Sequence, residues 1–308
     1  MTAVDGSGVN GTGSLPFLVD AQLAVEQVRI RTQVRKSHLA LNGRDDPETD
    51  RVLEQLLGVE EYVDGRVAEI IRFHPAYPWF SKVKGVGNEN IGKIVGLVRV
   101  APETAIVENE DGEGVEVELP YAKTISALWK FCGYHVVDGR APKKKPGEKL
   151  DFNAQARTMC WRLSTAITKA GIRQFCTECD RQRPPKKEGK DPVCECGSTS
   201  FESRGTSKFA ELYLREKTRL YQVYANRGVA VVPASQLPKD ERGKRYEPAN
   251  MISEGHVHNQ ALRKMTKIFL GCLWLVWREA MDLPTRSPYA IEQLGHTTLI
   301  SPWDMVDR

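Results

Sequence analysis

The apolar residues of this 308-residue chain recur mostly every three or four positions, which is the period of an amphipathic helix. The first such segment runs from Asp20, a possible N-cap, to about Leu41, and its opposite face is basic. Asp46-Pro47 is typical of the cap and first turn of a second helix, which continues to Ile71. A short turn joins the two helices, so we predict an antiparallel helical hairpin or coiled coil whose simplest role is to pack on the core.

The period changes to alternation between Val100 and Leu119. Apolar residues there occupy every second position on either side of a Gly-rich turn, a pattern that predicts a small β-hairpin. Seven acidic residues lie between Glu103 and Glu118. We expect a solvated hairpin rather than a metal or acid–base site, with its acidic face turned away from any nucleic acid.

Helical spacing returns in the rest of the chain and predicts three more long helices, at residues 152–170, 207–226 and 253–281. Cys132, Cys160 and Cys272 lie on apolar helical faces and are expected in the core. His256 and His258 begin the last helix without a third metal ligand nearby, and the segment after Leu283 is expected to be irregular. The predicted fold class is therefore mainly α.

Two glycines mark a helix–hairpin–helix core between Lys82 and Val95. Gly85 and Gly87 flank a tight turn, and we expect the turn to need glycine at both positions because a Cβ would clash there. A helix follows, and its first backbone N–H groups can bind an anion. Such a unit holds a phosphodiester backbone, although a lone Gly-x-Gly turn is more often an ordinary helix corner. The backbone-binding candidates of this core are Lys84, Asn88, Asn90 and Lys93.

Positive charge is concentrated in one region. The whole chain has a net charge of only +4, yet the stretch from Leu119 to Lys190 has sixteen Lys/Arg against six Asp/Glu, a local excess of +10. Clustering of this kind is typical of a polyanion site, although one lysine-rich loop alone would be ordinary solvated surface. The RNA-binding candidates here are Arg140, Lys143, Lys144, Lys145, Lys149 and Arg157.

Four cysteines have the spacing of a zinc ribbon. Cys176 and Cys179 form a Cys-x-x-Cys pair, and Cys194 and Cys196 form a Cys-x-Cys pair after a basic loop. Thiolates bind Zn²⁺ tetrahedrally, and a polar insertion of this size has no core of its own around which to fold. We predict structural zinc, because four cysteines leave no open coordination position for catalysis.

Other sequence features argue against a membrane protein and against an enzyme. No apolar run approaches the roughly 18 residues of a membrane span, and the Gly/Ser-rich start lacks a signal-peptide pattern, so we expect a cytoplasmic protein. No set of carboxylates on alternating strands could hold two Mg²⁺ ions, and Ser164 has no supporting catalytic residues. There is no P-loop and no Rossmann fingerprint. We therefore expect a binding protein without chemistry of its own.

The glycine turn, the helix around Ala127–Phe131 and the basic loop Gly139–Gly147 occur in an order that resembles the Nop domain of box C/D RNA–protein particles. The region is also similar to the Tas proteins of RNA-guided TIGR systems and to the C-terminal half of RNA-guided insertion-sequence transposases. The resemblance implies a small guide RNA and target DNA as partners, and a homodimer formed through the N-terminal helices. The alternatives are a transposase and a non-specific helix–hairpin–helix DNA-binding protein.

The combined pattern predicts five segments. They are a flexible tail (1–16), a helical hairpin (17–74), a Nop-like nucleic-acid-binding core (75–173), an inserted zinc ribbon (174–204) and a C-terminal helical part that completes the core (205–308).

Overall fold

The protein is mainly helical, as the spacing of apolar residues predicts, with 53% of the described residues in helices and small sheets of two strands. The structure, a computed structural model, describes residues 13–109, 113–144, 147–186, 191–285 and 300–307. The α-helices in these ranges are α1 (Leu15–Leu41), α2 (Pro47–Ile70), α3 (Tyr77–Phe80), α4 (Asn88–Leu97), α5 (Ile125–Phe131), α6 (Ala154–Gly171), α7 (Lys208–Asn226) and α8 (Glu254–Glu279).

Three two-stranded sheets and three short 3₁₀ helices complete the described elements. The antiparallel sheets pair β1 (Thr104–Glu108) with β2 (Gly114–Glu118) and β3 (Ile172–Cys176) with β4 (Phe201–Gly205). The short β5 (Ala230–Val232) and β6 (Met251–Ser253) are parallel, and the sequence pattern did not indicate them. The 3₁₀ helices are η1 (Ile71–Phe73), η2 (Ala234–Gln236) and η3 (Pro302–Met305).

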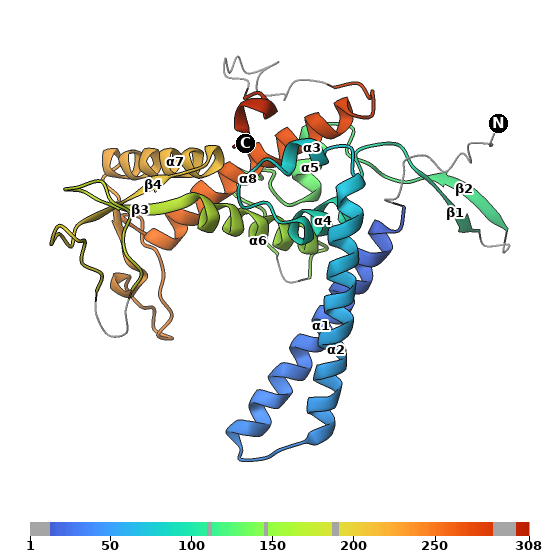
Figure 1. The fold of residues 1–308 in the computed structure, drawn as a ribbon, viewed down its shortest axis with the longest axis horizontal. Coiled ribbons are helices and arrows are strands. Elements are labelled where there is room, and N and C mark those ends of the chain that lie inside the picture. Colours follow the sequence, from blue (N-terminus) through green and yellow to red (C-terminus); the bar gives the residue numbers. More distant parts are fainter. Residues whose placement is uncertain (1–12, 110–112, 145–146, 187–190, 286–299, 308) are drawn as a thin grey trace.

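Helices α1 and α2 form an antiparallel arm that extends away from the body of the molecule (Figure 1). The predicted start of α1 at Asp20 is wrong, because Ser14 is the N-cap and Pro16 lies in the first turn. The early start allows Leu15 and Val19 to pack against α4, where a Cβ on Gly96 would lie 2.6 Å from Val19. The predicted tail is therefore helical at its end, and residues 1–12 lie outside the described residues.

Only the base of the arm contributes to the core. Val63 and Val67 of α2 are buried, whereas apolar residues nearer the tip are exposed, among them Val34, Val52 and Leu57. The distal half of the arm is instead joined by polar contacts between its two helices. These ion pairs are Arg29–Glu60, Arg35–Asp46 and Lys36–Asp50.

One hydrophobic core includes buried residues from α1 to η3. Helix α8 lies at its centre, α6 and α7 pack against it and against each other, and α4 packs on α6 (Figure 1). The largest buried rings are those of Trp79, Trp274, Phe80, Phe209 and Phe269. Cys132, Cys160 and Cys272 are buried in this core, as their positions on apolar helical faces predicted.

The glycine turn leads from the single turn of α3 into α4, and its two glycines are not equivalent. Gly85 has a φ of +90°, and a Cβ there would lie 2.7 Å from the Cα of Ile167 in α6. Gly87 has extended backbone as the N-cap of α4, and no atom lies closer than 4.0 Å to its would-be Cβ. Only Gly85 is therefore required by the turn, and the expectation that both glycines are required is wrong.

The β1–β2 pair projects from the body (Figure 1), and most of its residues are exposed on both faces. Its apolar residues Val107, Val115 and Val117 are all at least a third exposed, because no third strand or helix of the described chain covers them. Sheet β3–β4 also extends outward, since β3 continues directly from α6 and β4 leads into α7. Cys176 is the last residue of β3, and Cys179, Cys194 and Cys196 lie in the segment between these two strands.

The C-terminal segment is not wholly irregular. Residues 286–299 lie outside the described residues, but η3 packs on α8 and buries Met305. The indole N–H of Trp79 donates to the Pro302 carbonyl oxygen at 2.7 Å. The Asp307 carboxylate accepts from the backbone N–H groups of Lys84 and Lys208. These contacts join the end of the described chain to the turn before α4 and to the start of α7.

Candidate metal centre and nucleic-acid interface

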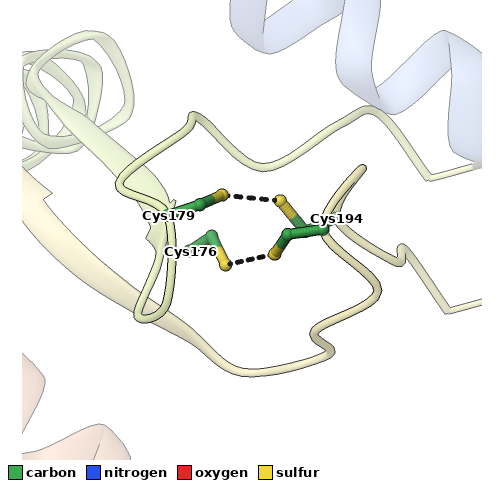
Figure 2. A group of neighbouring side chains, drawn as sticks. Cys176, Cys179 and Cys194 are labelled. Atoms are coloured by element: carbon green, nitrogen blue, oxygen red, sulfur yellow. Dashed lines mark hydrogen bonds between the residues drawn. The ribbon is translucent and has the colours of Figure 1, made fainter.

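Four cysteine thiols meet at the outer end of the β3–β4 sheet (Figure 2). The sulfur atoms of Cys176, Cys179, Cys194 and Cys196 all lie within 4.8 Å of one another. Those of Cys176 and Cys196 are 3.5 Å apart, and those of Cys179 and Cys194 are 3.3 Å apart. Tetrahedral zinc with sulfur ligands at about 2.3 Å separates the sulfurs by about 3.8 Å. The four residues can therefore hold a metal ion such as zinc.

Two tight turns present these thiols. In the first, the Asp180 N–H donates to the Cys176 carbonyl oxygen, and Asp180 has a φ of +62°. In the second, the Gly197 N–H donates to the Cys194 carbonyl oxygen, and Gly197 has a φ of +88°. The Cys-x-Cys spacing of the second pair therefore still places both of its sulfurs in the cluster.

Burial alone would raise the pKa of Cys176, but contacts with its sulfur outweigh that effect. Backbone N–H groups of Glu178 and Cys179, together with the thiols of Cys196 and Cys194, lower this pKa to about 6. The lowered pKa of Cys176 favours its thiolate, which is the form that binds a metal.

The basic loop after α5 begins at a two-residue turn. Asp138 and Gly139 have φ values of +49° and +74°, and Val137 and Arg140 exchange two backbone hydrogen bonds across them. This hairpin turn presents Arg140 at the surface, followed by the exposed Lys143, Lys144 and Lys149. Lys145 lies outside the described residues.

Most of the predicted RNA-binding residues of the glycine turn already contact other groups within the protein. The Lys93 ammonium is buried 2.9 Å from the Asp64 carboxylate, and the Lys84 ammonium donates to the Thr206 hydroxyl at 2.9 Å. The Asn88 amide donates to the Ala68 carbonyl oxygen. Asn90 is half-buried, and Glu89 adds a negative charge to the first turn of α4. A negative charge there opposes anion binding at the helix N-terminus.

Arg157 lies apart from those residues, on α6 beside the basic loop. Its guanidinium donates to the Pro142 carbonyl oxygen at 2.9 Å and stacks over the Phe152 ring. Across a groove, Arg263 of α8 donates to the carbonyl oxygens of Gly133 and His135. The two arginines therefore hold both ends of the connection between α5 and the basic loop against α6 and α8.

Sequence reasoning missed the α8 side of this surface. Arg263, Lys264 and Lys267 follow one another at helical spacing, and Lys267 stacks over the Trp129 ring. The available signal was the short spacing of these cations on a helix with a broad apolar face. The two histidines at the start of α8 have protein partners, because His256 contacts Glu247 and His258 contacts the Tyr213 hydroxyl.

Comparison with protein families, with curated proteins and with solved structures found no match. Among the described residues, no helix has both the length and the apolar content to cross a membrane.

Proposed function

We propose that this protein is the guide-RNA-binding component of an RNA-guided, DNA-targeting ribonucleoprotein and that it has no nuclease chemistry of its own. Two things support the proposal. The first is the resemblance of the glycine turn, the Ala127–Phe131 helix and the basic loop to Nop domains and Tas proteins. The second is that seven basic residues of this region have no carboxylate partner among the described residues.

This lack of carboxylate partners is the main support, and it contrasts with several basic residues elsewhere in the protein. On the arm, Arg35, Lys36 and Arg51 each have a carboxylate partner, and in the zinc ribbon Arg181 and Arg204 do as well. No ion pair within 4.0 Å is found for seven described cations of the basic loop and of the neighbouring parts of α6 and α8, which are Arg140, Lys143, Lys144, Lys149, Arg157, Arg263 and Lys267. Positive charge without a protein partner attracts a polyanion more strongly than charge already neutralised.

The guide RNA would follow the basic loop and the neighbouring surface of α6 and α8. The turn before α4 would take part less than its sequence suggests, since Lys84 and Lys93 already have partners within the protein. The zinc ribbon would have a structural role: four thiolates complete a tetrahedral zinc site and hold the end of the β3–β4 sheet together.

The test is purification of the full chain with its nucleic acid, followed by sequencing of the bound RNA. We expect a discrete population of small RNAs with the wild type. A variant with Arg140, Lys143 and Lys144 all changed to Ala should lose it. The matched control changes Arg35, Lys36 and Arg51, which removes the same charge from paired positions on the arm and should retain the RNA.

Other outcomes would favour the alternatives. Equal binding of duplex DNA and RNA, with neither affected by the loop variant, would favour a helix–hairpin–helix DNA-binding protein. Cleavage or joining of DNA with Mg²⁺ and guide RNA, abolished by a single substitution, would favour a transposase.

A further inference from the structure

A groove of about 440 Å³ lies between α6 and α8 and has one wall formed by the start of the basic loop. Its volume is within the range of small-molecule pockets, roughly 300–1,000 Å³. From α6 it is lined by Arg157 and Trp161, which are four residues apart and so share one face of the helix. From α8 it is lined by Asn259, Gln260 and Arg263, which also share a face.

Trp161 is the exposed aromatic ring of this groove. Its side chain is 50% exposed, although Cys160 beside it and Leu163 after it are buried. A single exposed apolar residue is ordinary on a protein surface. Trp161 differs because its ring lines a groove that also contains cationic and amide side chains. An aromatic ring in this setting is a stacking platform for an unpaired base.

Two guanidiniums face the same groove without a carboxylate partner among the described residues. Arg157 uses one N–H group and Arg263 two in bonds to backbone carbonyls, so each has further donors for an anion. Burial, and then the nearby Arg157 guanidinium, lower the pKa of Arg263. A bound phosphate would relieve this repulsion.

We propose that the groove binds one unstacked nucleotide of the RNA, with its base stacked on Trp161 and its phosphate between Arg157 and Arg263. The proposal rests on the proposed function and adds to it a site that takes a single base out of the strand. The amides of Asn259 and Gln260 at the rim provide donors and acceptors for the edge of that base. The Tyr224 hydroxyl donates to the Gln260 carbonyl oxygen at 2.9 Å, which orients that amide.

The test uses single-stranded RNA 12-mers of each base, and a 12-mer with one 2-aminopurine whose fluorescence falls when it stacks on an aromatic ring. Affinity and quenching are measured for the wild type and for Trp161→Ala and Trp161→Phe. The control is Trp303→Ala, because Trp303 is equally exposed at 49% but lies in η3, away from the groove. Circular dichroism checks that every variant is folded.

We expect Trp161→Ala to bind about tenfold more weakly and to lose the quenching, since one stacked base contributes roughly that much. Trp161→Phe should restore most of both, and Trp303→Ala should change neither. Unchanged affinity and quenching in Trp161→Ala, with RNA binding still sensitive to the Arg140, Lys143 and Lys144 variant, would overturn the nucleotide site alone. Failure of the wild type to bind any RNA at low salt would overturn the proposed function as well.

Discussion

At the scale of single residues, Gly85 and Gly87 belong to the same motif, but only Gly85 has a backbone conformation that needs glycine. Gly85→Ser should destabilise the protein by about 3 kcal/mol, because a side chain would strain the positive φ and contact the backbone of α6. Gly87→Ser should be neutral or slightly stabilising, since serine is a good N-cap at an extended, open position. Urea unfolding of both variants measures the difference, and equal losses would contradict this account of the turn.

The burial of His74 leads to a prediction of how the stability of the protein depends on pH. His74 is buried with its ring 4.2 Å from that of Trp277, and burial lowers its pKa to about 3. The unfolded chain takes up a proton near pH 6.5, whereas the folded protein does not. The stability that comes from keeping His74 neutral is therefore complete above pH 6.5 and is lost as the pH falls toward 3. The free energy of unfolding then decreases by at most about 1.4 kcal/mol per pH unit.

The test compares wild type with His74→Gln by urea unfolding at pH 7.5 and pH 5. The wild type should lose about 2 kcal/mol more than the variant between these two values. His38→Gln is the control, because His38 is exposed on α1 and should leave the pH dependence of the wild type unchanged. Parallel behaviour of wild type and His74→Gln would mean that His74 is not kept neutral by the fold.

At the scale of elements, we expect the four-cysteine segment to depend on a bound zinc ion for its folding, while the helical body does not. We expect about one zinc per chain, and Cys179→Ser should lose it and unfold the ribbon locally, since metal binding stabilises such segments by about 10–16 kcal/mol. The helical signal in circular dichroism should persist, because α6 and α7 pack in the main core. Glu195→Gln, in the same turn as Cys194 and Cys196, is the control and should retain zinc. Wild-type protein that contains no zinc after mild purification would exclude the site.

The arm is an element with much of its apolar surface uncovered, and we propose it as the interface of a homodimer. Val34 and Leu57 are 48% and 49% exposed in its distal half. Replacing them with Lys and Glu, respectively, should convert a dimer to a monomer in light-scattering measurements, because charge at an apolar interface is costly to bury. Ile106→Glu on the exposed β1–β2 pair is the control and should leave the mass unchanged. A wild-type monomer at all concentrations would rule out this interface.

At the scale of the whole molecule, the distribution of charge matters more than its total of +4. Each phosphate contact in single-stranded RNA contributes about 0.7 to the slope of log affinity against log salt. The Arg140, Lys143 and Lys144 variant should therefore lower that slope by about 2 and weaken binding about a hundredfold at moderate salt. Fluorescence anisotropy across a salt series measures both quantities. An equal loss from the Arg35, Lys36 and Arg51 variant would mean that only net charge matters.

Local features of the sequence were sufficient for the mainly helical fold and for the four-cysteine cluster. Helices α7 and α8 begin close to the predicted residues 207 and 253, where Ser207 and Ser253 are the N-caps, because a cap depends on residues three positions apart. The cysteines were predictable for the same reason, since each pair lies within a single turn. The predicted start of α1 at Asp20 was too late, although Ser14 and Pro16 are a local signal for the earlier start, because the packing of this first turn on α4 is not visible in the sequence.

Only the tertiary structure decided which basic residues are available to a ligand. Lys84 and Lys143 are alike in sequence, but Thr206 and Asp307 reach the turn that contains Lys84, while Lys143 remains exposed without an ion-pair partner in the described chain. The groove likewise requires Trp161 and Arg263, which are far apart in the chain and meet only because α6 packs on α8. Charge neutralisation and burial depend on distance in space, so residue type and spacing alone could not predict either.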